Sequence, residues 1–136
     1  DFMGFMKMVE EVISEHHGAK PVHSPEEMDL LAKRFPENIK LFSSYKDNVV
    51  VAGCLIYESK NVAHGQYAAN STLGRTVSAQ DVIIDYMINE YYVYKKYFDF
   101  GTSTLDFGRV LNEGLIAHKE SFGASSVVYD FYELSF

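Results

Sequence analysis

The sequence has one cysteine, no tryptophan and 3 prolines among 136 residues. The single Cys54 excludes an internal disulfide. It lies in an apolar run, so we expect a small core residue in a protein of the reducing cytoplasm. No run of about 18 apolar residues occurs, so the sequence predicts no membrane span. Lys7, Glu10 and Glu11 interrupt the apolar residues near the start, which argues against a signal peptide.

Basic residues are also scarce, since 12 Lys and Arg stand against 19 Asp and Glu, for a net charge of −7. This balance excludes a nucleic-acid groove as the main purpose of the chain and predicts no DNA partner. The hydrophobic share of 47%, with 10 Tyr and 10 Phe, is enough for a packed core. We therefore expect a single domain over 1–136. The chain starts inside a helical pattern, so we expect it to be the C-terminal part of a longer protein.

The apolar periodicity predicts four helices and five strands. The helices are expected at 2–17, 24–35, 78–95 and 115–122. The strands are expected at 39–46, 49–59, 62–70, 97–101 and 126–134. A capping box of Ser24 and Glu27 starts the second helix, and Ser78 is the expected N-cap of the third, which should end at Lys95 and Lys96. Residues 71–77 are expected to form a loop.

The order of these elements predicts the sheet. Strands 39–46 and 49–59 form an antiparallel hairpin through a turn at 46–48. The unit of strand 62–70, helix 78–95 and strand 97–101 is a βαβ crossover, which makes its two strands parallel neighbours. The sheet is therefore mixed, and the fold class is α+β or α/β.

Two strand positions are candidates for chemistry. Asp99 alternates with Phe98 and Phe100, and the strand is followed by a polar loop and a helix N-terminus, where such sheets place ligands. His64 and Gln66 share one face of strand 62–70, where they could face a substrate. In the alternative interpretation, Asp99 is a satisfied carboxylate at a strand end and His64 is satisfied by a neighbour on the sheet. The residues alone leave both interpretations open.

Three histidines near the start, His16, His17 and His23, are candidate metal ligands by residue type alone. Their spacing matches no zinc pattern, and they have no cysteine partner. We therefore predict no metal site.

The order of elements and several sequence runs resemble the GNAT acyltransferase fold without its first strand. The chain is similar to GNAT-like proteins of the Fem type, found in bacterial cell-wall and surface-polysaccharide gene neighbourhoods. The similarity covers about the whole chain. The matching runs are KPVHSPEEMDLLAKRFPENIKLF, VAGCLIYES, HGQYAAN, KYFDFGTS, NEGLIAHKESFG and VVYDFYEL.

This resemblance implies a mixed sheet with helices on both faces, in which strands 62–70 and 97–101 part to hold an acyl donor. It implies acetyl-CoA or another acyl-CoA, although loop 71–77 lacks the Q/R-x-x-G-x-G/A phosphate motif. The implied catalytic residues are His64, Asp99 and Lys119. The implied substrate-binding residues are Gln66, Tyr67, Ser103, Asn112 and Glu113. The implied cofactor-binding residues are Asn70, Gly74 and Arg75.

The resemblance also implies the activity, an N-acyltransferase that acts on an amine of a sugar, glycan or peptide precursor. Two alternatives stay open: a Fem-type aminoacyl transferase that uses aminoacyl-tRNA, and a non-catalytic binding or assembly module. The expected partners are a small-molecule or glycan acceptor, and a second copy of the chain through a sheet edge.

Overall fold

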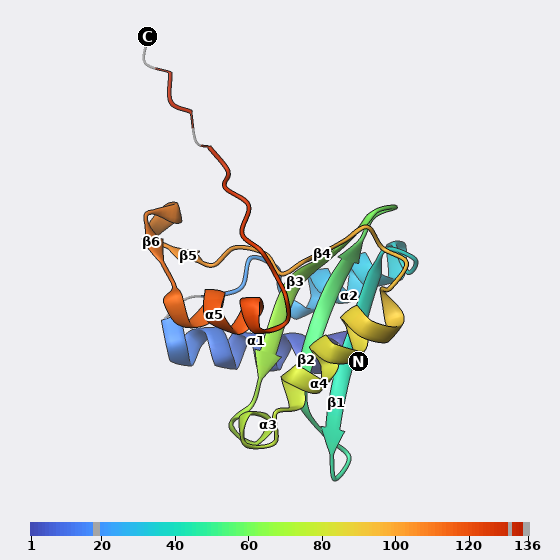
Figure 1. The fold of residues 1–136 in the computed structure, drawn as a ribbon. Helices are drawn as coiled ribbons and strands as arrows, with labels where there is room; N and C mark the ends of the chain where they lie inside the picture. Colours follow the sequence, from blue (N-terminus) through green and yellow to red (C-terminus); the bar gives the residue numbers. More distant parts are fainter. Residues whose placement is uncertain (18–19, 131, 135–136) are drawn as a thin grey trace. The chain divides into compact units, whose positions relative to one another are not determined.

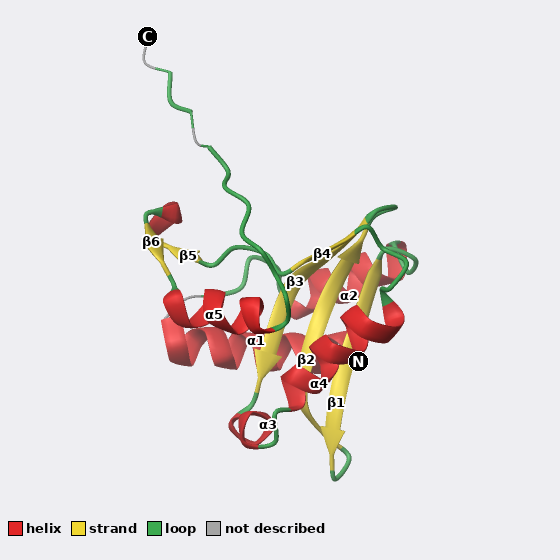
Figure 2. Cartoon of the chain, viewed as in Figure 1, coloured by secondary structure: helices red, strands yellow, loops and turns green. Residues whose placement is uncertain are grey.

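The computed structural model describes residues 1–17, 20–130 and 132–134. The chain divides into two compact units, Asp1–Gly101 and Thr102–Phe136, and each is described by itself. The first unit is a mixed sheet covered by helices on both faces (Figures 1 and 2), as the sequence predicts.

The sheet has four strands in the order β1 (Ile39–Lys46), β2 (Val49–Glu58), β3 (Val62–Asn70) and β4 (Tyr97–Asp99). The first three are antiparallel, and β3 and β4 are parallel, so the predicted hairpin and crossover are confirmed. Asp47 and Asn48 have φ of 51° and 63°, which is the backbone of a two-residue hairpin turn. Strand β4 ends at Asp99, two residues before the predicted end of 97–101.

Helices α1 (Phe2–His17) and α2 (Pro25–Arg34) cover one face of the sheet. The predicted capping box at Ser24 and Glu27 is present at the start of α2. The core between these helices and the sheet is built from apolar side chains of five elements: Phe5, Met6, Val9, Met28, Ala32, Ile39, Leu55 and Ala69.

Helix α4 (Ala79–Tyr86) covers the other face and continues as a π-helical turn, Met87–Tyr91. The prediction of one helix from 78 to 95 is wrong at its end, whereas Ser78 stands at the N-cap position as predicted but with φ of 50° and without a side-chain cap. The helix stops before Lys95, because Tyr92 turns inward and is buried with Glu58 and Phe42. Burial on this face raises the pKa of the Cys54 thiol to about 12, consistent with a core residue.

The predicted loop 71–77 contains a short helix, α3 (Thr72–Thr76). Ser71 is its N-cap, because the Ser71 hydroxyl oxygen accepts a hydrogen bond of 3.0 Å from the Gly74 amide. The prediction missed it because one turn of helix is too short to show apolar periodicity.

Strand β3 carries a bulge at Gln66. Leu55 of β2 pairs with Tyr67, whereas the next residue, Ile56, pairs with Gly65, so Gln66 has no partner of its own across the β2 ladder. The bulge shifts the pleat by one residue. His64 therefore shares its face with Tyr67 and Ala69, and the prediction that it shares a face with Gln66 is wrong.

The second unit contains a small antiparallel pair, β5 (Thr104–Leu105) and β6 (Val110–Leu111), joined by a 3₁₀ turn, Asp106–Gly108. Helix α5 (Glu113–Ser121) follows, and it starts two residues before the predicted start at 115.

The predicted strand 126–134 is not formed in its described residues, while Phe131 lies outside them. The segment alternates apolar and polar residues as a strand does. Val127 and Tyr129 are nonetheless 71% and 77% exposed, and no strand of the described second unit pairs with the segment. Alternation predicts which residues could share a face, but a strand also needs a neighbour for its backbone groups.

Candidate functional site

The structure brings His64 and Asp99 together. They are register partners on the parallel strands β3 and β4, and parallel partners point to the same face of a sheet. His64 Nδ1 lies 2.7 Å from Asp99 Oδ2, and the two side chains are 37% and 46% exposed. The two side chains are therefore fixed by their mutual contact and remain accessible to a substrate.

Asp99 is fixed from its other side. Its second carboxylate oxygen, Oδ1, accepts a hydrogen bond of 2.8 Å from the Gly101 amide. Gly101 has φ of +71°, a conformation that glycine adopts without strain. The chain turns sharply after β4 and so anchors the carboxylate that contacts His64.

The sheet opens next to this pair. Pairing between β3 and β4 ends at His64 and Asp99, but β3 continues to Asn70. Within the described first unit, residues 65–70 pair with β2 alone, apart from the bulged Gln66. One edge of β3 therefore presents backbone groups that no strand of this unit takes up.

Tyr67 and His23 form a second polar contact on the same face. The Tyr67 hydroxyl lies 2.9 Å from His23 Nδ1 and accepts a hydrogen bond of 3.3 Å from the His23 amide. Across the strands, Tyr57 is the register partner of His64. Burial, with a smaller contribution from Tyr67, raises the pKa of Tyr57. Sequence reasoning considered His23 only as a metal ligand, and the loop before Ser24 gave no signal of its contact with Tyr67.

The predicted cofactor residues lie where β3 runs into α3. Asn70 Oδ1 is buried and has no hydrogen-bond partner among the described residues. A Cβ at Gly74 would collide with that oxygen and with the Val51 carbonyl, so the glycine lets α3 pack onto the sheet. Arg75 is exposed in the last turn of α3. The Arg75 guanidinium, the start of α3 and the nearby hydroxyl groups can all donate hydrogen bonds. Together these donors fit a phosphate group.

Four predicted site residues belong to the second unit. Asn112 caps α5, since its side-chain oxygen accepts a 3.0 Å bond from the Leu115 amide, and Glu113 follows in the first turn. The Ser103 carbonyl accepts a 2.8 Å bond from the Asn112 amide. Lys119 is buried, and its ammonium donates a 2.6 Å bond to the Thr102 carbonyl. These contacts give Asn112 and Lys119 structural roles, and their roles in binding and catalysis stay predictions.

Among the described residues, no three His, Cys, Asp or Glu side chains lie close enough together to hold a metal ion. The side chains of His16 and His17 lie outside this description. Among the described helices, none has the length and apolar character to cross a membrane.

Comparison with known proteins gives a family match. A sequence model described as an acetyltransferase (GNAT) domain matches residues 1–114. A search of functionally curated proteins returns no significant match.

Solved structures with the same fold include two aminoglycoside acetyltransferases and one possible acetyltransferase. The first is described as a possible acetyltransferase from Clostridium difficile 630, with a TM-score of 0.70, 13% identity, and coverage of 100% of this chain and 91% of that one. The second is the aminoglycoside acetyltransferase meta-AAC0020 from an uncultured soil metagenomic sample, in complex with sisomicin. Its TM-score is 0.64 at 18% identity, over 98% and 88% of the chains. The third, the aminoglycoside acetyltransferase HMB0005 from such a sample, has a TM-score of 0.62 at 14% identity, over 99% and 88%.

Proposed function

Because this chain belongs to the acetyltransferase (GNAT) domain family, we propose that it transfers an acetyl group from acetyl-CoA to a primary amine of a small-molecule acceptor. The observation that carries the proposal is the His64–Asp99 pair at the point where β3 and β4 separate. The aminoglycoside acetyltransferases among the similar structures support an amine as the acceptor group.

His64 is the proposed general base. Its Nδ1 faces the Asp99 carboxylate, so the neutral ring that donates the Nδ1 proton to Asp99 keeps a lone pair on Nε2. No described residue forms a hydrogen bond with Nε2. This nitrogen accepts the proton that the acceptor amine loses. Asp99 selects the tautomer and, held by Gly101, orients the ring.

The donor is held by the open edge of β3 and the turn that follows it. Acetyl-CoA, when bound, supplies an activated thioester, and the transfer yields an amide and a free thiol that carries the proton lost by the amine. Backbone amides of residues 65–70 are the proposed donors to the acyl carbonyl oxygen. Arg75 and the start of α3, with Asn70 and Gly74 as their packed base, are proposed to hold the phosphates.

Further residues are proposed to bind the acceptor. Tyr67 lies on the face of His64, and Gln66 is the bulged residue of β3. Ser103, Asn112 and Glu113 are also proposed as acceptor-binding residues. Lys119 is proposed as a further catalytic group from α5.

The finer predictions concern the cellular setting. They are an acceptor from a bacterial cell-envelope polysaccharide or peptide precursor, a cytoplasmic location and a homodimer through a sheet edge, and each remains to be tested. The Fem-type alternative needs a surface for transfer RNA, which the net charge of −7 disfavours.

The test is acetyl transfer to a panel of amines, measured as release of free thiol from acetyl-CoA. Replacing His64→Ala or Asp99→Asn should lower kcat about 10²–10⁴-fold, with an unchanged circular dichroism spectrum. Asp85→Asn is the matched control, because Asp85 is an exposed carboxylate whose hydrogen-bond partner is Asn89 on the next turn of the same helical segment. Full activity in the His64 and Asp99 variants would overturn the assignment, and no thiol release with any amine would overturn the function.

A further inference from the structure

A shallow cavity of about 320 Å³, wide open to solvent, lies in the first unit, where α2 meets the ends of β1 and β2. This volume is at the low end of small-molecule sites. A second cavity of the same volume lies between β1 and α4, on the opposite face from His64. The lining of the first cavity is formed by His23, Leu31, Phe35, Asn38, Ile39, Tyr57 and Glu58.

The first cavity adjoins the proposed base through two of its wall residues. Tyr57 is the register partner of His64 on the neighbouring strand, and register partners share a face of the sheet. His23 bonds to the hydroxyl of Tyr67, which the bulge brings to the face of His64. A molecule seated in the cavity therefore lies on the face of the sheet where His64 Nε2 accepts a proton.

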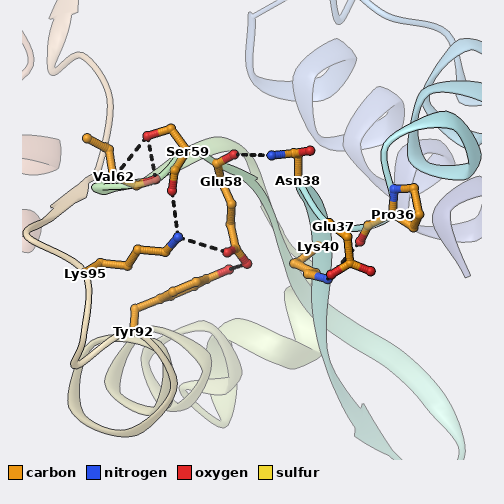
Figure 3. A network of polar contacts seen from close by, with 9 residues as sticks. All are labelled: Pro36, Glu37, Asn38, Lys40, Glu58, Ser59, Val62, Tyr92 and Lys95. Atoms are coloured by element: carbon orange, nitrogen blue, oxygen red, sulfur yellow. Dashed lines mark hydrogen bonds and ion pairs between the residues drawn. The ribbon is translucent and has the colours of Figure 1, made fainter.

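The side chains of Glu58 and Asn38 already have partners within the protein, as Figure 3 shows. The Glu58 carboxylate accepts a 2.8 Å bond from the Tyr92 hydroxyl and pairs with Lys95 at 3.2 Å. The Asn38 amide donates a 2.9 Å bond to the Glu58 carbonyl. The hydroxyl of Tyr57 donates to the Met28 sulfur at 3.4 Å.

The surface left for a ligand is therefore mainly apolar and comes from Leu31, Phe35, Ile39 and the ring of Tyr57. The Glu58 carboxylate is turned toward Tyr92 and Lys95, and Lys95 neutralises it, so no carboxylate among the described wall residues is left to balance several positive charges. An amino sugar placed against this wall would lose hydration of its hydroxyl and ammonium groups without replacing it. An alkyl or aryl group would instead gain from burial.

We infer that the acceptor is a primary amine carried on an aromatic or branched apolar group, and that this cavity holds the apolar group. The inference rests on the proposed acetyl transfer. It makes the cavity wall, and Phe35 in particular, the part of the protein that selects the acceptor. Arylalkyl amines and peptides with an apolar first residue share this chemistry.

The first experiment compares acceptors in the acetyl-transfer assay. Phenethylamine and L-phenylalaninamide represent the two sources of an apolar amine, and glucosamine and sisomicin represent amino sugars. At least one apolar amine should exceed both amino sugars in kcat/KM by about tenfold or more. Equal or higher values for the amino sugars would overturn the inference and leave acetyl transfer itself intact.

The second experiment tests the cavity wall. Phe35→Ala should raise the KM for the preferred apolar amine about tenfold, while kcat and the KM for acetyl-CoA stay unchanged. Leu30→Ala is the matched control, because Leu30 lies on the same helix and is 47% exposed, against 50% for Phe35 at the helix end. An equal KM in the two variants would overturn the inference.

A binding measurement separates failure of the inference from failure of the proposed function. Calorimetric titration of phenethylamine and L-phenylalaninamide into the His64→Ala protein requires no turnover. At least one of them should bind, and binding should weaken when Phe35→Ala is added. Binding without acetyl transfer in the unmodified protein would refute the enzyme and keep the pocket. Acetyl transfer to amino sugars, with no binding of apolar amines, would refute the pocket and keep the enzyme.

Discussion

A single glycine decides how firmly the proposed acid–base pair is held. The Gly101 amide bonds to Asp99 Oδ1, and it can do so because the backbone at Gly101 has φ of +71°. A Cβ at this position would lie 3.6 Å from the Gly65 carbonyl oxygen and 3.9 Å from His64 Cε1, which are ordinary contacts. The requirement for glycine is thus one of backbone conformation, since a side chain would fit.

We predict that Gly101→Ala lowers stability by about 1 kcal/mol through backbone strain. It should also lower kcat about tenfold, because the turn that anchors the Asp99 carboxylate relaxes. Gly123→Ala provides the control: its φ is +84° and a Cβ there would have nothing within 4 Å, so the strain is similar. Urea unfolding and steady-state kinetics measure both effects. The same kcat in the two variants would show that the turn does not position Asp99.

At the scale of elements, a buried polar network ties the chain segment before β4 to the end of β2. The Lys95 ammonium donates a 2.7 Å bond to the Ser59 carbonyl and pairs with the Glu58 carboxylate. Tyr92 donates to the same carboxylate, and its pKa is raised, first by burial and then by this bond to Glu58. The network fixes the chain segment just before β4. Pairing of β4 then begins with the hydrogen bond from the Tyr97 amide to the Asn61 carbonyl.

Removing one partner of this buried pair leaves the other charge without compensation. The side chains of Lys95 and Glu58 are 8% and 9% exposed, so we predict that Lys95→Met destabilises the protein by about 3 kcal/mol. Lys96→Met, at the exposed neighbouring position, should change stability by less than about 0.5 kcal/mol. Urea unfolding of both variants provides the comparison. A loss of less than about 1 kcal/mol for Lys95→Met would mean that the network contributes little to stability.

The sequence predicts the elements whose patterns are local. The hairpin from Ile39 to Glu58 and the capping box at Ser24 follow from alternation and from turn and cap chemistry, and the structure has them. The bulge at Gln66 and the inward turn of Tyr92 depend on tertiary packing instead. The sequence places His64 and Asp99 on neighbouring parallel strands, but it predicts neither the bond between them nor the bulge that brings Tyr67 to the face of His64.

The predicted site residues belong to two units of the chain. The acid–base pair and the residues proposed to hold the donor all belong to the unit Asp1–Gly101, whereas Ser103, Asn112, Glu113 and Lys119 belong to Thr102–Phe136. If the proposed assignment is correct, binding of the donor should depend on the first unit and on Arg75 in particular.

Acetyl-CoA should therefore stabilise the chain by about 2.7 kcal/mol when its concentration is about a hundred times its Kd, because it binds the folded protein and has no site on the unfolded one. Arg75→Gln should raise that Kd about tenfold, since it removes the charge that faces the phosphates. Arg34→Gln, an exposed arginine on α2, should leave it unchanged. Hydrogen exchange should slow on acetyl-CoA binding at 65–76, where β3 runs into α3. Protection confined to α5, or an equal Kd in the two arginine variants, would place the donor elsewhere on the chain.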